Sequence, residues 1–489
     1  MVFPVVGGTQ DTGYEISNSL RFNDDDSPSM TIASLGSSSS NAKKWTVSFW
    51  AKLSSGLGGH RCVFSAGESS GGNYVQLNFT DGDELQLYSS NALGEANNTA
   101  TNIKTNAKYR DVSAWYHVVW AIDTTQSTNT NRIKLYVNGA QVTSFVTANN
   151  YPAQNTDNDR VGANNIDHFI GKFVDSSSQY VDGYLSDFYF IDGDAKSYTD
   201  FGETNDNGVW IPKRYAGSYG NNGFKLEFKQ TGTSANSSGI GADTSGNDNH
   251  FSVSNLAAID VTTDTPTNNF ATLNFLDTNS NHTFSEGNCK IAYSASAGNF
   301  GVTKSTMGVA KGKWYWEIKY TYGNAGQFGV FDINDTETNT ADIFTAAGNS
   351  TFEGLAWRID SSNNIKECAD GQTDDTNVDF SSGNILGIAF DADNGKIYGY
   401  NNGTELTSQD ISAGTSLITA VTVSDFYLPF ISNGDGGSGT KTGTSEINFG
   451  NPTFSISSGN SDANGYGNFE YSVPSGYYAL CTKNLAEYG

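Results

Sequence analysis

The chain has 489 residues, which is too long for one ordinary domain, so two or three domains are expected. Aromatic residues make up 13% of it, and its 29 Phe, 25 Tyr and 54 Gly favour strands joined by many turns. The formal net charge of -25 repels phosphate groups and therefore disfavours DNA or RNA as a partner.

The first residues, MVFPVVGGTQDTGYEISNSL, contain neither a basic segment nor an apolar run of signal-peptide length. No stretch approaches the roughly 18 apolar residues of a membrane span. We therefore expect no membrane insertion and a protein that is made in a cytoplasm.

The four cysteines show no CxxC spacing and are too sparse for a disulfide scaffold. They are Cys62, Cys289, Cys368 and Cys481. We expect buried thiols. The alternative is that Cys289 approaches Cys481, if the last strand pairs near the first strand of its domain.

Three strand patterns follow one another in the first half. In WTVSFWAKL, Trp45, Val47 and Phe49 share one face. The nearly continuous apolar run WYHVVWAID predicts a strand buried between two layers. In IKLYVNGAQV, Asn138-Gly139 predicts a hairpin closed by a type I′ turn, because these two residues tolerate positive φ angles.

Residues 196–285 differ from both flanks. They contain the small-polar run SANSSGIGADTSGNDN between short strand-like segments. The stretch is too loop-rich to bury a large core alone, so we expect a connector that packs on its neighbours.

The same three patterns recur in the second half. They are KWYWEIKYTYG, with Trp314, Trp316 and Ile318 on one face together with Tyr320, then NILGIAFDAD, then GKIYGYNNGTEL with its own Asn-Gly. Their recurrence in the same order indicates a duplicated architecture. No segment shows helical periodicity over more than two turns, so few and short helices are expected.

The first half resembles laminin-G-like jelly rolls of the concanavalin type. The blocks that carry this resemblance are NSLRFND (18–24), WTVSFWAKL (45–53), CVFSAG (62–67), WYHVVWAID (115–123), IKLYVNGAQV (133–142) and GYLSDFYFIDG (183–193). The last block is similar to that family's closing strand, which returns beside the first strand.

The carboxyl half resembles the SPRY family, another concanavalin-like sandwich. Its blocks are GKWYWEIKY (312–320), QFGVFD (327–332), ILGIAFDADNGKIYGYNNG (385–403), FYLPFIS (426–432), EINFG (446–450) and VPSGYYAL (473–480).

Together these resemblances imply an all-β chain of two concanavalin-like jelly-roll β-sandwiches in tandem with a short β-rich connector. The expected divisions are an N-terminal arm and first strand (1–24), a laminin-G-like sandwich (25–195), the connector (196–285) and a SPRY-like sandwich (286–489).

Combined with DTSGNDNHFSVSNL (243–256) and DTPTNNF (264–270), this order resembles large structural proteins of tailed bacteriophages. The resemblance implies a non-enzymatic component of the virion exterior, of the tail-fibre, head-fibre or capsid-decoration type. Its partners would be other virion proteins, and its arm, 1–13, would dock on one of them. Such proteins are commonly homotrimers, although no heptad repeat is visible.

The alternative function is a lectin-like, receptor-binding adhesin, viral or bacterial, that contacts a host-surface glycan or protein. Sandwich folds bind such ligands through loops at one edge. Most aromatic residues here occupy alternating strand positions and so belong to the core. The sequence therefore identifies no binding residues.

Catalysis finds no support in the sequence. Sandwich glycosidases need two closely spaced carboxylates, in an ExDxxE-type pattern that is absent here. The acidic clusters at 24–26 and 81–84 lie beside Gly, Ser or Pro and predict solvated turns. Cys62 has no nearby base in the sequence.

The five histidines show no zinc spacing. They are His60, His117, His168, His250 and His282. For His117, inside an apolar strand, we expect a hydrogen-bonded or edge position.

No cofactor is expected, and calcium is the one alternative left open. Asp391-Ala-Asp393-Asn-Gly395 resembles the start of an EF-hand loop but lacks its closing glutamate, so it predicts a tight turn. The weak calcium candidates are Asp243, Asn247 and Asp248 in DTSGNDN, for which a plain Asx-rich loop is favoured.

Overall fold

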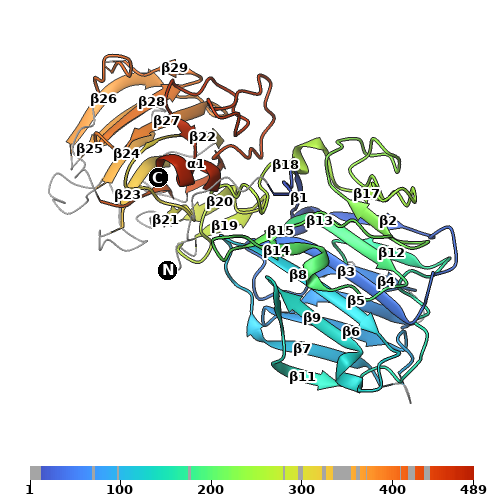
Figure 1. Ribbon diagram of the computed structural model, residues 1–489. Helices are drawn as coiled ribbons and strands as arrows, with labels where there is room; N and C mark the ends of the chain where they lie inside the picture. Colours follow the sequence, from blue (N-terminus) through green and yellow to red (C-terminus); the bar gives the residue numbers. More distant parts are fainter. Residues whose placement is uncertain are drawn as a thin grey trace. The chain divides into compact units, whose positions relative to one another are not determined.

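The computed structural model describes residues 13–68, 72–95, 99–174, 178–278, 281–295, 301–321, 326–333, 354–359, 364–369, 372–407, 409–416, 425–433 and 441–489. The chain divides into two compact units, Gln10–Thr267 and Asn268–Gly489, here called the first and second unit (Figure 1). Both consist mainly of antiparallel sheets, so the predicted all-β class is confirmed.

The division between the units falls inside the expected connector, 196–285. Residues 196–267 belong to the first unit because their strands β16, β17 and β18 extend its sheets. Residues 268–285 belong to the second unit. The expected docking arm, 1–13, lies outside the described residues except for Gly13.

The first unit contains two sheets of eight strands each. Sheet A runs β10 (Ala140–Gln141), β9 (Ile133–Val137), β8 (Trp115–Asp123), β3 (Lys44–Leu53), β13 (Gly183–Asp192), β1 (Ser19–Phe22) and β18 (Val261–Thr262), with β16 (Phe224–Leu226) also paired to β13. Sheet B runs β11 (Phe145–Asn149), β7 (Thr101–Lys108), β6 (Glu84–Ser90), β5 (Tyr74–Phe79), β4 (Arg61–Gly67), β12 (Asp167–Ile170), β2 (Ser29–Ile32) and β17 (Ser252–Ser254).

The second unit has an eight-stranded and a six-stranded sheet. Sheet C runs β19 (His282–Ser285), β20 (Lys290–Ala295), β31 (Lys441–Asn448), β22 (Lys313–Thr321), β27 (Ile385–Asp391), β28 (Lys396–Asn401) and β29 (Thr404–Glu405), with β32 (Tyr478–Ala479) beside β22. Sheet D runs β21 (Gly301–Lys304), β30 (Tyr427–Asn433), β23 (Gly326–Asp332), β24 (Gly354–Ile359), β25 (Asn364–Ala369) and β26 (Gln372–Asp379).

Helices are few and short, as predicted. Within the described residues the α-helix is α1 (Thr482–Tyr488), and the 3-10 turns are η1 (Asp24–Asp26), η3 (Asn129–Asn131), η4 (Tyr198–Asp200) and η5 (Ala258–Asp260). No helix in the described part of the chain has the length and apolar character needed to span a membrane.

The predicted alternation of aromatic residues is confirmed in both units. Trp45, Val47 and Phe49 of β3 lie in one buried cluster between sheets A and B. Trp316 and Ile318 of β22 lie, with their aromatic neighbours, in the cluster between sheets C and D. Period-two spacing places these side chains on one face because successive strand residues point to opposite sides.

The closing strand of the first unit lies where the resemblance implied. β13 pairs with β3 on one side and with β1 on the other. Its second half pairs with β16 instead of β1. At the change of partner, Asp187 has a φ of 46° and the register to β3 shifts, so a β-bulge separates the two pairings.

A further layer covers the second face of sheet A. It includes η4 and the hairpin of β14 (Gly202–Thr204) and β15 (Trp210–Pro212). Phe201 and Tyr215 of this layer form a buried cluster with Val119 and Tyr189 of the sheet. The prediction that WYHVVWAID is buried between two layers is therefore confirmed.

The second unit repeats this arrangement. Tyr315 of β22 and Tyr398 of β28 face away from the main core and pack on Phe469 and Tyr477 from the carboxyl-terminal stretch. β27 is buried along its whole length. The duplication therefore extends to a cover over one sheet of each sandwich.

Both predicted Asn-Gly hairpins are type I′ turns. φ is 46° at Asn138 and 78° at Gly139, and 47° at Asn402 and 76° at Gly403. The asparagine side chains also act alike, since each accepts a hydrogen bond from the backbone N–H of the neighbouring long strand. The distances are 2.7 Å from His117 N to Asn138 and 2.9 Å from Ile385 N to Asn402.

The covers contact these same turns. A Cβ added at Gly139 would lie 2.4 Å from the ring of Trp210, and one at Gly403 would lie 2.4 Å from the ring of Tyr471. Only glycine leaves room for such an approach. Each Asn-Gly turn therefore joins its sheet to the cover above it.

Replacing either turn asparagine by alanine should destabilise its unit by about 2 kcal/mol, because a backbone N–H loses its acceptor and alanine resists positive φ. Denaturant unfolding of Asn138→Ala and Asn402→Ala measures this. Asn138→Asp and Asn402→Asp are the matched controls, since aspartate keeps an acceptor oxygen and tolerates positive φ, and they should lose much less. Equal losses in the alanine and aspartate variants would contradict this role.

Candidate functional site

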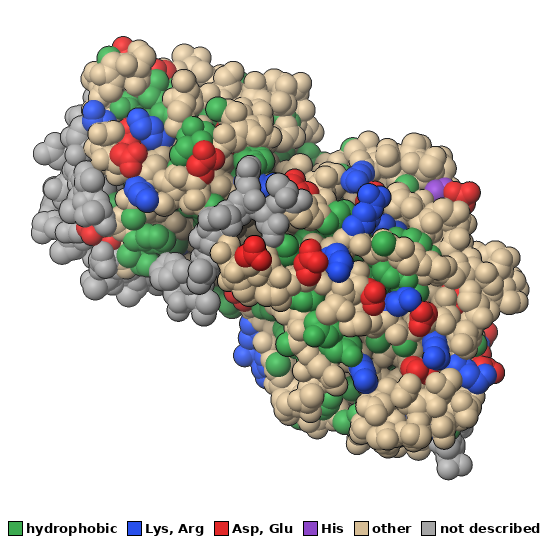
Figure 2. Space-filling model, in the orientation of Figure 1, with side chains coloured by type: hydrophobic (Ala, Val, Ile, Leu, Met, Phe, Trp, Pro, Cys, Tyr) green, Lys and Arg blue, Asp and Glu red, His purple; other side chains and the backbone are tan. Residues whose placement is uncertain are grey.

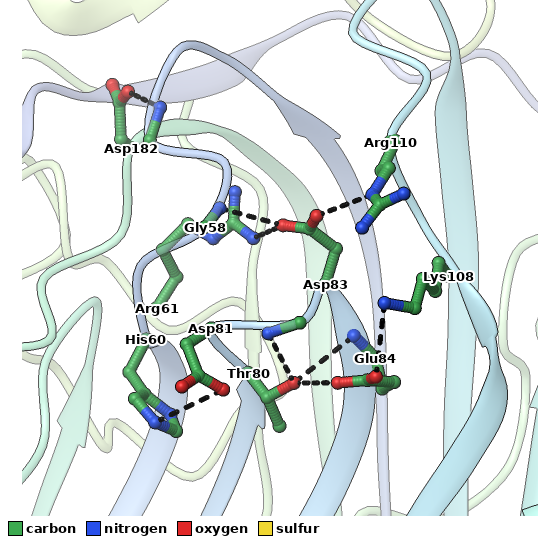
Figure 3. A network of polar contacts seen from close by, with 12 residues as sticks. Gly58, His60, Arg61, Thr80, Asp81, Asp83, Glu84, Lys108, Arg110 and Asp182 are labelled. Atoms are coloured by element: carbon green, nitrogen blue, oxygen red, sulfur yellow. Dashed lines mark hydrogen bonds and ion pairs between the residues drawn. The ribbon is translucent and has the colours of Figure 1, made fainter.

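Loops at one end of the first unit converge on the carboxylate of Asp83, in the turn between β5 and β6 (Figure 3). One oxygen accepts from the Gly58 amide at 3.0 Å and from Arg61 Nη2 at 2.7 Å. The other accepts from Arg110 Nε at 2.7 Å. Asp83 therefore joins the β3–β4 loop, the β5–β6 turn and the segment before β8.

The prediction of a solvated turn at 81–84 is wrong for Asp83. Its side chain is 4% exposed, whereas that of Asp81 is 71% exposed. Glu84 is also largely buried and is held by the Thr80 hydroxyl and by Lys108 at 3.6 Å. The other acidic cluster, 24–26, is exposed as predicted. Neighbouring Gly, Ser or Pro residues indicate a turn. They do not indicate whether an acidic side chain in that turn points into solvent or inward to an arginine.

Asp83 is ionised in spite of its burial. Burial alone would raise its pKa, but hydrogen bonds from Arg110, the Gly58 amide and Arg61 outweigh this effect and lower it. A carboxylate bound by two guanidinium groups is a poor proton donor and a poor nucleophile, because its lone pairs are already engaged.

A second buried carboxylate, Asp182, holds the same β3–β4 loop. One of its oxygens accepts from the Gly56 amide at 2.7 Å and from Ser55 Oγ at 3.0 Å. Burial raises the pKa of Asp182, against the opposing effect of its serine and amide donors and of the Arg61 charge. Both carboxylates therefore bind loop groups, which is a structural task.

The three calcium candidates make separate contacts in the structure. Asp243 receives the amides of Lys225, Ser245 and Asn249 at 2.8–2.9 Å. Asn247 donates to backbone carbonyls, and the side chain of Asp248 is 87% exposed. Within the described residues no group of three or more His, Cys, Asp or Glu side chains forms a metal-binding cluster.

The EF-hand-like segment is the predicted tight turn. It joins β27 to β28, and Asp391 accepts from the Asn394 amide at 3.1 Å. Asp393 accepts from the Gly312 amide at 2.8 Å, and Asp391 pairs with Lys313 at 2.9 Å.

His117 is hydrogen-bonded, as predicted, but it lies in the middle of sheet A because β8 pairs with β3 and β9. Trp210 Nε1 donates to its Nδ1 at 3.0 Å. Its Nε2 therefore carries the hydrogen that is shared with Ser48 Oγ at 3.0 Å. Burial lowers the pKa of His117 to about 3, so the ring is neutral.

Two other histidines have internal roles. His168 accepts from the Gly162 amide at 2.8 Å, and burial lowers its pKa to about 4. His282 contacts Thr303 Oγ1 at 2.6 Å, and burial likewise lowers its pKa to about 4. His60, in contrast, is partly exposed beside Asp81. His250 accepts from the Asp243 amide at 2.9 Å.

The cysteines match the prediction of buried thiols where they are described. Cys62, Cys289 and Cys481 are buried, and because the thiol of Cys481 is free, the alternative bond between Cys289 and Cys481 is not formed. Burial raises the pKa of Cys62 to about 12, which makes a thiolate nucleophile unavailable at neutral pH. The side chain of Cys368 lies outside the described residues.

Four buried lysine and arginine side chains in the described part of the chain were not predicted from the sequence. Arg21 Nη2 lies 3.6 Å from Asp260 Oδ1. Arg61 binds Asp83 as described above. Lys52 binds Asp264 at 2.8 Å, and Lys225 lies between two carboxyl groups. The available signal was a lone charged residue inside an apolar strand, as in FWAKL and GFKLEF.

Asp83→Asn should destabilise the first unit by about 3 kcal/mol at neutral pH, because the Arg61 charge stays buried without its ionic partner. The folded pKa of Asp83 lies below the unfolded value of about 4. Its contribution is thus complete above that value and is lost as pH falls through the folded pKa.

Urea unfolding at several pH values should show the gap between wild type and Asp83→Asn closing in acid. The exposed neighbour provides the control, since Asp81→Asn should change stability by less than about 0.5 kcal/mol. A gap that stays constant down to acid pH would contradict this assignment.

Comparison with known proteins supports the architecture. A laminin-G-type model of the concanavalin A-like lectin/glucanases superfamily matches residues 24–197. No curated protein matches the chain.

Two solved structures have similar parts. The SPRY domain of human HERC1 is 16% identical, with a TM-score of 0.26, over 36% of this chain and 96% of that chain. The heptameric SAP-like pentraxin from Limulus polyphemus is 15% identical, with a TM-score of 0.27, over 38% of this chain and 80% of that chain. The stretch 24–197 that the laminin-G-type model matches lies within the first unit, as the laminin-G-like resemblance predicted.

Proposed function

We propose that this protein is a non-enzymatic structural component of the exterior of a tailed-bacteriophage virion, a fibre or a capsid decoration protein. The non-enzymatic part of this proposal is supported most directly by the positions of the chemically reactive side chains. Asp83, Asp182, His117 and Cys62 are buried and bonded within the fold. They hold strands and loops in place instead of opening onto a substrate.

The virion assignment is supported by the resemblance of the blocks at 243–256 and 264–270 to phage structural proteins. In the structure residues 243–256 and 264–267 are parts of the first unit's framework, and residues 268–270 belong to the second unit. β17 extends sheet B, and Asp264 binds the buried Lys52. Figure 2 shows a face on which scattered acidic and basic side chains lie among hydrophobic and other side chains.

Immunogold electron microscopy of purified phage particles tests this proposal. Antibody against the recombinant chain should label intact virions at a regular position, on the capsid or on a fibre. Contacts with neighbouring virion proteins and a homotrimeric state belong to the same proposal, and light scattering measures the latter. Labelling confined to debris or to host cells, with unlabelled particles, would overturn it.

The second candidate is a lectin-like adhesin that binds host-surface glycans. It is favoured by the match of residues 24–197 to the lectin/glucanases superfamily. A glycan array should then show selective binding, and incubation with the bound polysaccharide should release no reducing sugar. Failure to bind both the array and whole host cells would remove this candidate, and release of reducing sugar would contradict the non-enzymatic assignment.

A further inference from the structure

The ammonium group of Lys225 lies in an enclosed polar cluster on the outer side of sheet A. Its side chain is 4% exposed, that of Asp187 is 3% exposed and that of Glu227 is 14% exposed. Lys225 Nζ lies 2.7 Å from Glu227 Oε1 and 3.4 Å from Asp187 Oδ1. One lysine therefore faces two carboxyl groups in a site that is largely closed to water.

Backbone geometry directs the groups toward one another. Asp187 occupies the bulge of β13, at a φ of 46° that a non-glycine residue rarely adopts. Lys225 is on the adjacent strand β16, directly opposite Tyr189. Glu227 follows Lys225 by two residues, which returns its side chain to the same side of the chain.

Two tyrosine hydroxyls bind the Asp187 carboxyl. Tyr14 donates to Oδ1 at 3.1 Å, and Tyr189 donates to Oδ2 at 2.7 Å. The same Tyr14 oxygen accepts from Lys225 Nζ at 2.9 Å. Donors at both oxygens withdraw electrons from the carboxyl carbon and would stabilise negative charge that develops there.

The two carboxyl groups differ in protonation. Burial raises the pKa of Asp187 more than the Lys225 charge and the tyrosine donors lower it. For Glu227, burial is outweighed by the hydrogen bond and charge of Lys225 and by Lys229, so its pKa is lowered. Of the two carboxyl groups, Asp187 therefore binds a proton more readily than Glu227 does. Neighbouring carboxyls whose pKa values are driven apart commonly divide acid and base roles.

We propose that Lys225 and Asp187 become joined by an intramolecular isopeptide bond, with Glu227 carrying the proton. Lys225 Nζ gives a proton to Glu227 and attacks Cγ of the neutral Asp187 carboxyl. The carbonyl oxygen becomes an oxyanion held by a tyrosine hydroxyl. Glu227 then returns this proton to the departing hydroxyl group, which leaves as one water when the C–O bond breaks. Glu227 also takes the second proton that the nitrogen must lose and passes it to solvent, so that a neutral amide N–C bond remains. No oxidant or cofactor is needed.

Such a bond would tie β13 to β16. β16 lies beyond the stretch 24–197 that matches the superfamily model. The amide would therefore link β16, which follows the matched stretch, covalently to β13 of the sandwich. For a protein exposed on a particle, this would resist unfolding in the way that a disulfide does in an oxidising environment.

The intact mass of the full-length recombinant chain, measured after denaturation, tests the proposal directly. It should be lower than the sequence mass by one water. Proteolysis followed by tandem mass spectrometry should yield a branched peptide that joins the segment of Asp187 to that of Lys225. An unmodified mass, with both segments found only as linear peptides, overturns the proposal. A mass lower by one water also overturns it if the peptides place the loss at another pair of residues or at an Asp-Gly sequence.

Single-residue variants identify the side chains that take part in bond formation. Lys225→Arg and Asp187→Ala should restore the full mass, and Glu227→Gln should retain the reactants but slow or abolish bond formation. Lys52→Arg is the matched control, since Lys52 and Asp264 form another buried pair at 2.8 Å, and it should keep the missing water. A deficit that survives Lys225→Arg would contradict the assignment. If a variant fails to fold, the peptide map of the wild-type chain still decides.

Discussion

Both units depend on one kind of interaction, the hydrogen bond from a loop amide to a buried carboxylate. Long connections in a sandwich carry backbone N–H groups that need acceptors once they are removed from water. Asp83 and Asp182 supply them for the β3–β4 loop, and Asp243 supplies them for the 243–249 turn. In the second unit Asp462 receives the Asn464, Tyr466 and Ala479 amides, and Glu317 receives those of residues 470 and 471. The acidity of the chain is thus partly an internal structural feature.

The covers over sheets A and C explain the high aromatic content. A strand that is buried on both faces needs mostly apolar side chains, and the sequences of β8 and β27 are mostly apolar. Aromatic side chains also bring polar atoms, so Trp210 reaches His117 and Tyr315 reaches Glu317 through the layer between sheet and cover. Covering a sheet face with a chain extension removes that face from the surface available to ligands.

Alternation and Asn-Gly signals predicted the strands and both hairpins because these depend on local periodicity and turn geometry. The buried thiols were predicted from the sparse cysteines and the missing CxxC spacing. The inward fold of Asp83 was not predictable in this way, since its partners Arg61 and Arg110 lie 22 and 27 residues away. The same holds for Lys52 and Asp264, which are 212 residues apart. Charge pairing across such separations is set by the packing of whole sheets, and a single sequence carries no record of it.

A framework fixed by its own carboxylates suits a protein that presents surfaces, because amide, hydroxyl and guanidinium groups of the same chain hold these carboxylates in place. Hydrogen–deuterium exchange of the loop amides of Gly56, Gly58 and Asn249 in the presence of a chelator tests this claim most directly. The account predicts protection close to that of the sheet strands, unchanged when calcium is added. Rapid exchange that slows only on addition of calcium would contradict it.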